Sequence, residues 1–122
     1  MISNEARLDR RAAIRTLLEN RGDLLLVTGL GSTSWDAASV ADDEHNFYLW
    51  GAMGAAAMVG LGLAIARPDR CVLVVTGDGE MLMGLGSLAT IGVAPAKPGD
   101  CGFRQRPLRR NGHAGEPYGE DG

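Results

Sequence analysis

The sequence predicts an α/β fold built on a partial doubly wound parallel sheet, and three observations support this prediction. Two continuous apolar runs, residues 24–28 and 71–76, have the composition of strands that are buried on both faces. Helical patterns precede, separate and follow these runs. Parallel strands need such crossovers, so the order helix, strand, loop, helix, strand, turn, helix favours one open parallel sheet.

Each helix has its own pattern. Residues 5–20 place apolar side chains near one helical face, with Asn4 as a cap and Gly22 as the end. Residues 51–66 form a Gly/Ala-rich segment that Arg67 and Pro68 terminate, and 81–91 give a third helix after the second strand.

Composition limits the function classes. With 122 residues there is room for one domain, and a net charge of −3 argues against a nucleic-acid or anionic-membrane surface. The charged N-terminus lacks the apolar run of a signal peptide, so we expect a cytoplasmic protein. An alternative is a membrane span over the uncharged residues 47–66, but four Gly and six Ala in it favour a helix packed on a sheet.

The chain divides near Pro95. Residues 1–96 carry the apolar periodicity, whereas 97–122 are rich in Gly, Arg and other polar residues and show no helical or strand period. We therefore expect an incomplete domain followed by a disordered tail, with the C-terminal strands of the sheet missing.

The turn Gly77–Asp78–Gly79 follows the second buried strand and opens a helix. Ligands of open α/β sheets bind at the carboxyl ends of the strands, glycines admit close backbone approach, and a carboxylate suits Mg²⁺. This pattern indicates a magnesium–diphosphate site. The alternative is a plain strand-to-helix turn in which Asp78 caps the helix.

A second glycine loop, Trp50–Gly54, precedes the Gly/Ala-rich helix. Its small residues would let backbone groups reach a ligand, and Met53 could support a flat ring. The alternative is that Met53 is an ordinary core residue.

Two further functional interpretations match the sequence motifs less well. The loop 29–34 imitates a dinucleotide fingerprint but lacks its third glycine. The second interpretation is a hydrolase, but the sequence lacks a G-x-S-x-G elbow. It does contain residues that could act as nucleophile or base: Ser32, Thr33, Ser34, His45 and His113.

Taken together, Y-L-W-G-A-M-G and C-V-L-V-V-T-G-D-G-E-M-L-M-G-L-G-S-L-A-T-I-G resemble the diphosphate-binding (PP) domain of thiamine diphosphate enzymes, of the sulfopyruvate and phosphonopyruvate decarboxylase type. The resemblance covers residues from about 20 to 94. It implies thiamine diphosphate and Mg²⁺ as cofactors and a small 2-oxo acid as substrate. It also implies a partner subunit with the pyrimidine-binding (PYR) domain, whose Glu activates the cofactor, within a homo- or hetero-oligomer.

The resemblance implies roles residue by residue. Asp78 would ligate Mg²⁺, Gly51 would present its carbonyl to the aminopyrimidine, and Met53 would hold the cofactor in a bent form. The cofactor-binding set it implies is Gly51, Ala52, Met53, Gly54, Gly77, Asp78, Gly79 and Glu80. No catalytic residue is expected on this chain.

The family pattern continues to an Asn on the next strand as the second side-chain metal ligand, but here Gln105 stands in the polar tail. Reading residues 97–122 one base later permits a string that contains A-I-A-V-F-D-N-D-R-Y-G-E-T-G, which supplies the missing strand and motif. We therefore expect a frameshift near 95–97, and a chain that binds the cofactor weakly and is inactive by itself. The alternatives are a non-catalytic interaction module and a Rossmann-like nucleotide binder.

Overall fold

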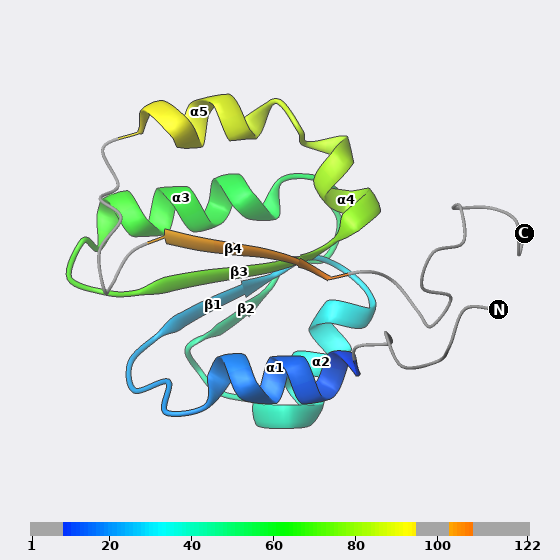
Figure 1. Cartoon of the computed structure of the whole chain (residues 1–122). Helices are drawn as coiled ribbons and strands as arrows, with labels where there is room; N and C mark the ends of the chain where they lie inside the picture. The colour runs from blue at the N-terminus through cyan, green and yellow to red at the C-terminus, as the bar shows by residue number, and fades with distance from the viewer. Residues whose placement is uncertain (1–8, 95–102, 109–122) are drawn as a thin grey trace, which may run out of the picture.

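The computed structural model describes residues 9–94 and 103–108 (Figure 1). The elements along the chain are α1 (Arg10–Leu18), β1 (Leu25–Thr28), α2 (Ser32–Ala41), β2 (Asn46–Tyr48), α3 (Ala56–Ala66), β3 (Val72–Gly77), α4 (Asp78–Met83), α5 (Ser87–Val93) and β4 (Phe103–Leu108).

The strands form one parallel sheet in the order β2-β1-β3-β4. Helices α1 and α2 cover one face, and α3 and α5 lie over the other (Figure 1). The α/β fold class with an open parallel sheet is therefore confirmed.

Alternate residues of β1 and β3 enter two separate cores. Leu26, Leu73 and Val75 pack with α1 and α2, whereas Val27 and Val74 pack with α3. This division explains why both strands are continuously apolar, since a central parallel strand is buried on both faces.

Several local features differ from the prediction. The first helix begins at Arg10 with Asp9 as its N-cap, not at residue 5 with Asn4 as the cap, and residues 46–48 form the unpredicted strand β2. Residues 32–41 form α2 where only a loop was expected, because its buried side is made of small residues such as Ala37 and carries no strong apolar period. The second predicted helix begins at Ala56 rather than at residue 51, and the third is split into α4 and α5 around Gly84.

The prediction that residues 97–122 are a disordered tail without a strand is wrong for Phe103–Leu108. These residues form β4, which pairs in parallel with β3, from Val72 opposite Phe103 to Gly77 opposite Leu108. Within the described sheet β4 is a terminal strand that pairs through its backbone on one side, so it needs no continuous apolar run and tolerates Pro107. The other residues of the predicted tail lie outside the described residues.

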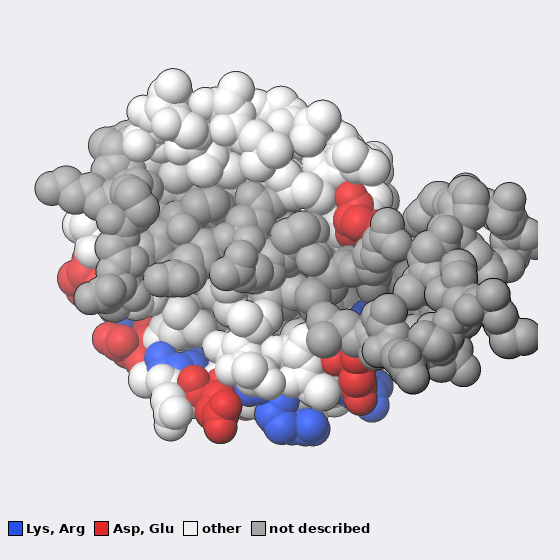
Figure 2. All heavy atoms as spheres, viewed as in Figure 1, with Lys and Arg blue, Asp and Glu red and all other residues white. Residues whose placement is uncertain are grey.

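The alternative of a membrane span is not supported in the described part of the chain, where no helix is long and apolar enough to cross a bilayer. Residues 47–66 instead contribute to β2, a loop and α3. Charged side chains gather over the α1 side of the face in Figure 2, while the α5 side of that face is uncharged.

Candidate functional site

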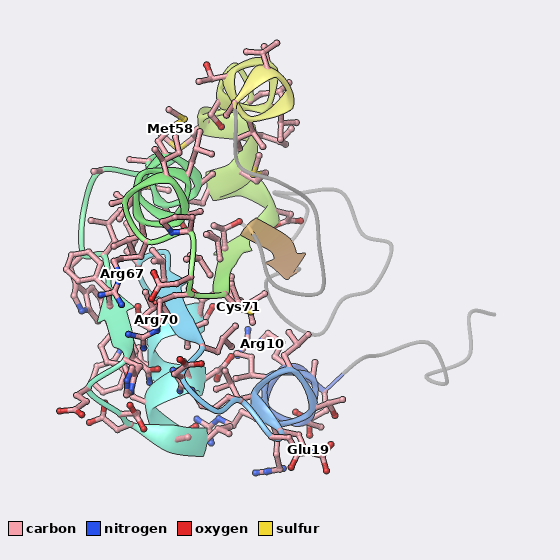
Figure 3. The ribbon with its side chains drawn as sticks, turned by 90° about the vertical axis from the view of Figure 1, so that its left-hand side faces the viewer. Arg10, Glu19, Met58, Arg67, Arg70 and Cys71 are labelled. Atoms are coloured by element: carbon pink, nitrogen blue, oxygen red, sulfur yellow. The ribbon has the colours of Figure 1, made fainter. Side chains whose placement is uncertain are left out.

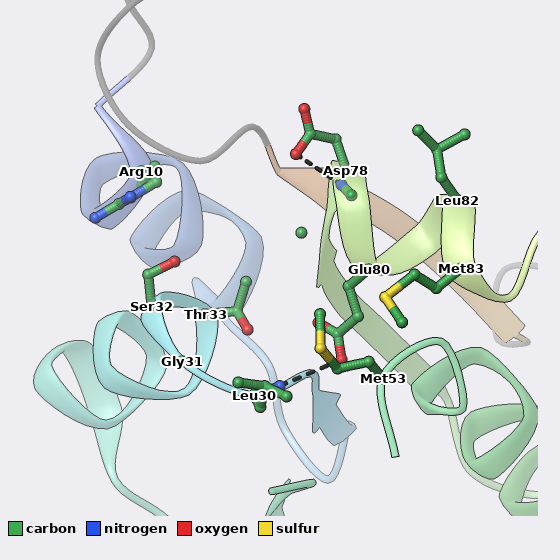
Figure 4. A pocket seen from close by; sticks show the side chains of 12 residues that line it. Arg10, Leu30, Gly31, Ser32, Thr33, Met53, Asp78, Glu80, Leu82 and Met83 are labelled. Atoms are coloured by element: carbon green, nitrogen blue, oxygen red, sulfur yellow. Dashed lines mark hydrogen bonds between the residues drawn. The ribbon is translucent and has the colours of Figure 1, made fainter. Parts of the chain in front are cut away.

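The carboxyl ends of β1 and β3 open into a pocket of about 760 Å³ (Figure 4). Its walls come from the start of α1, the loop after β1, the loop before α3 and the turn into α4. The lining residues are Arg10, Leu30, Gly31, Ser32, Thr33, Met53, Gly77, Asp78, Gly79, Glu80, Leu82 and Met83. The two glycine loops that the sequence singled out therefore meet at one site.

Asp78 is the first residue of α4 and lines this pocket. Its Oδ1 accepts a hydrogen bond from the Gly79 N–H at 2.8 Å. The helix cap is Gly77 and no side chain caps the helix, so the alternative in which Asp78 serves as the cap is not what forms. The carboxylate is thus placed at the edge where ligands of parallel sheets bind.

A metal at Asp78 would need further ligands. Among the described residues no group of three or more His, Cys, Asp or Glu side chains is placed to hold a metal ion. Mg²⁺ is commonly held by one or two carboxylates together with phosphate oxygens and water. The donor set therefore fits a metal that arrives with a phosphate group.

The side chain of Glu80 is buried and contacts the loop after β1. It is 6% exposed, and its Oε1 accepts a hydrogen bond from the Leu30 N–H at 3.4 Å. Its carboxylate also fills the space beside Gly29. Glu80 therefore connects the turn after β3 to the loop after β1.

The loop before α3 has an unusual backbone. Gly51, Ala52 and Gly54 have φ values of 86°, 49° and 92°, in the left-handed region, which is costly for Ala52 because it carries a Cβ. Met53 lines the pocket and is 48% exposed, so its interpretation as a core residue is wrong.

Gly51, Ala52 and Gly54 shape this loop but do not line the pocket. Gly54 instead contacts the backbone of Gly84, which anchors the loop against the end of α4.

Sequence reasoning missed the loop after β1 as part of this site. Leu30, Gly31, Ser32 and Thr33 all line the pocket. The signal was available, because this glycine loop follows the other buried strand and the carboxyl ends of parallel strands lie at one edge. The Thr33 hydroxyl donates to the Gly29 carbonyl at 2.8 Å and so holds the loop in shape.

Arg10 was also missed. It lies in the first turn of α1, lines the pocket, and its Nε is 3.0 Å from Oδ2 of Asp36 on α2. The Nε of Arg11 is 3.2 Å from the other oxygen of Asp36, which is only 2% exposed. No motif marks this group, because it depends on how α1 packs on α2.

The hydrolase alternative finds no support among the described residues. His45 immediately precedes β2, at the amino end of the sheet, whereas Ser32 and Thr33 follow the carboxyl end of β1. His45 pairs with Asp43, Nδ1 to Oδ1 at 2.6 Å, and hydrogen bonds from His45 lower the pKa of Asp43. His113 lies outside the described residues.

The pocket combines features that suit a phosphorylated cofactor with a flat ring. It offers a carboxylate for a cation, a guanidinium for an anion and the apolar side chains of Met53, Leu82 and Met83. Glycines 77 and 79 leave the backbone accessible to a bulky group.

Residues 29–94 match the family model described as "Thiamine pyrophosphate enzyme, C-terminal TPP binding domain". The chain is 46% identical over 80 residues to the sulfopyruvate decarboxylase subunit beta of Methanocaldococcus jannaschii, covering 65% of this chain and 42% of that protein. It is 49% identical over 88 residues to the phosphonopyruvate decarboxylase of Streptomyces viridochromogenes, covering 71% and 22%. The subunit beta of Methanococcus maripaludis is 39% identical over 90 residues, covering 74% and 48%. The chain thus spans less than half the length of these relatives.

Proposed function

Because the chain belongs to the thiamine pyrophosphate enzymes, through their C-terminal TPP binding domain, we propose that it is the diphosphate-binding part of a 2-oxo-acid decarboxylase. The substrate would be a small 2-oxo acid with a second anionic group, similar to sulfopyruvate or phosphonopyruvate, after which the relatives are named. The single observation that carries this proposal is the meeting of Asp78 and Met53 in one pocket.

The proposal assigns each residue a task. Asp78 holds Mg²⁺, while Gly79 and the backbone of Glu80 face the diphosphate. Gly51, which lies outside the pocket lining in the loop with Ala52 and Gly54, would present its carbonyl to the aminopyrimidine. Met53 would support the cofactor from the wall of the pocket that it lines.

Thiamine diphosphate, held through Mg²⁺ by Asp78 and supported by Met53, would supply the carbon nucleophile and the electron sink that decarboxylation of a 2-oxo acid needs. The protein contributes orientation, because a fixed geometry removes much of the entropic cost of bringing reactants together. Gly77 and Gly79 serve this task by allowing close approach of the backbone.

A partner subunit completes the site in this proposal. It would carry the pyrimidine-binding domain and the Glu that activates the cofactor ring. Two of the relatives quoted above are named as beta subunits, which supports a multi-subunit arrangement. Exposed apolar side chains on α4, on α5 and in the link between them would suit a protein contact: Leu82, Met83, Leu85, Leu88 and Val93.

We further propose that the end of the domain is out of frame and that this form of the chain is inactive by itself. The family match ends at residue 94, directly before the change in composition at Pro95. Gln105 pairs with Val74, three residues before β3 ends, so its register position is not at the carboxyl edge where Asp78 follows. A second side-chain metal ligand is therefore not expected from this position.

Calorimetry with thiamine diphosphate and Mg²⁺, with and without the partner subunit, tests the proposal. We expect weak binding by the chain alone and no independent decarboxylation, so micromolar binding by the chain alone would contradict the proposed inactivity. Asp78→Ala should abolish every effect of the cofactor. No effect of this substitution would favour a non-catalytic module, and binding of NAD or ATP in its place would favour a nucleotide binder.

A further inference from the structure

Arg10 and Asp78 lie on different sides of the pocket that both residues line (Figure 4). The two residues come from different elements, because Arg10 begins α1 and Asp78 begins α4. Among the lining residues that the structure describes, Arg10 is the one cation, and Asp78 and Glu80 are the two anions. The pocket therefore has opposite charges on different sides.

A buried carboxylate sets the position of Arg10. Asp36 is 2% exposed and lies 3.0 Å from the Arg10 Nε, while Arg11 contacts its other oxygen. One carboxylate therefore contacts two guanidinium groups. Because the Nε of Arg10 forms an ion pair with Asp36, the guanidinium is held at the pocket wall.

We propose that Arg10 is a second anchor for the diphosphate of the cofactor, positioned by Asp36 and opposite the metal bound by Asp78. This inference rests on the proposed function, since it concerns the same pocket. A diphosphate carries more negative charge than one Mg²⁺ neutralises, and a metal on Asp78 approaches it from one wall only. A guanidinium on the other wall matches the remaining phosphate oxygens, because its planar set of N–H donors binds oxyanions well.

Arg11 provides a matched control. It is the next residue of α1 and contacts the same carboxylate, but its side chain is 62% exposed and it does not line the pocket. Arg10→Gln and Arg11→Gln each remove one charge from the cluster and keep an amide that can donate to Asp36. Only Arg10→Gln should affect binding of an anion in the pocket.

The experiment titrates the full chain with inorganic pyrophosphate in the presence of Mg²⁺, followed by amide chemical shifts in NMR, which detect weak binding. We expect saturable shifts around the pocket and a dissociation constant raised about tenfold in Arg10→Gln, the effect of one charge-assisted contact. Arg11→Gln should bind within about twofold of the unchanged chain, which is the scale of a surface charge effect. The Nε resonance of Arg10 in the unchanged chain should move while that of Arg11 does not, a measurement that needs no variant to fold.

Methylphosphonate is titrated in parallel, because the anionic group of a substrate would present similar chemistry. Tighter binding of pyrophosphate supports the diphosphate assignment, whereas tighter binding of methylphosphonate overturns it. The inference is also overturned by absence of binding, by unchanged affinity in Arg10→Gln, or by an equal loss in Arg11→Gln.

Asp78→Asn separates the two proposals. Loss of the Mg²⁺ dependence in this variant, with no effect of Arg10→Gln, would refute the role of Arg10 alone. An effect of Arg10→Gln with an unchanged Mg²⁺ dependence in Asp78→Asn would instead refute the metal site of the proposed function.

Discussion

The carboxylate of Glu80 lies in the space that a side chain on Gly29 would occupy. Gly29 follows β1 and Glu80 belongs to α4, so this contact joins the loops that follow the two central strands. The Leu30 N–H donates to the same carboxylate at 3.4 Å. Two walls of the pocket therefore depend on one glycine and one buried acid.

This contact predicts coupling between the two positions. Gly29→Ala should lower the free energy of unfolding by about 1–2 kcal/mol, because the Glu80 side chain must move and abandon the Leu30 N–H. Adding Glu80→Ala should recover part of this loss, since the space is then open. Urea unfolding of the four chains measures a coupling energy of about 1 kcal/mol, and simple additivity of the two single changes would show that the contact is unimportant.

Gly54 packs closely against the backbone of Gly84. A Cβ on Gly54 would lie 2.7 Å from the Gly84 nitrogen, and its φ of 92° is strained for any other residue. Gly54→Ala should therefore destabilise the chain by about 2 kcal/mol or more.

Gly62 serves as the control for Gly54. It lies inside α3 and a Cβ there would meet nothing within 4 Å, so Gly62→Ala should raise stability by about 0.5–1 kcal/mol. Similar melting temperatures for both variants would argue against close packing of Gly54 on Gly84.

The turn between α3 and β3 predicts a pH effect (Figure 3). The Nε and Nη2 of Arg67 donate to the two carboxylate oxygens of Asp69 at 2.9 and 2.8 Å, and these bonds lower the pKa of Asp69 from 3.8 to about 2. Because the pKa of Asp69 is lower in the folded state than in the unfolded state, the ionised carboxylate stabilises the fold at pH values above its unfolded-state pKa. This stabilisation is lost as the pH falls.

The stabilisation from Asp69 should therefore be lost as the pH falls from its ordinary pKa of 3.8 to its folded-state pKa of about 2. In an NMR titration of side-chain carboxyl carbons, Arg67→Gln should move the midpoint of Asp69 back toward its ordinary value. An unchanged midpoint would mean that Arg67 does not pair with Asp69 in solution.

The proposed frameshift makes a prediction about the gene. The codons of Arg104–Gln105–Arg106, read one base later, should spell Asp-Asn, as CGA-CAA-CGA does. Sequencing checks this directly, and codons incompatible with the shifted string remove the hypothesis. A gene corrected by one base should yield a chain that binds thiamine diphosphate more tightly, because the correction would restore the proposed second metal ligand.

The local sequence was informative wherever burial sets the pattern. The runs at 24–28 and 71–76 predicted β1 and β3 because central parallel strands are apolar on both faces. The motif around Asp78 was sufficient to predict a site at the end of β3, because the chemistry of a glycine-flanked carboxylate is local. The helix α2 and the strands β2 and β4 were missed, because α2 and β4 contain small or polar residues that carry no such pattern and β2 has only three residues.

The sequence by itself therefore determined the fold class, the two central strands and the glycine turn that opens α4. Only the tertiary structure decided that Met53 and Asp78 share one pocket, that Glu80 fills the space beside Gly29, and that Arg10, which pairs with Asp36, lines the same pocket. The physical reason is distance along the chain: these contacts join residues about 25 to 50 positions apart, and their geometry exists only after the helices have packed on the sheet.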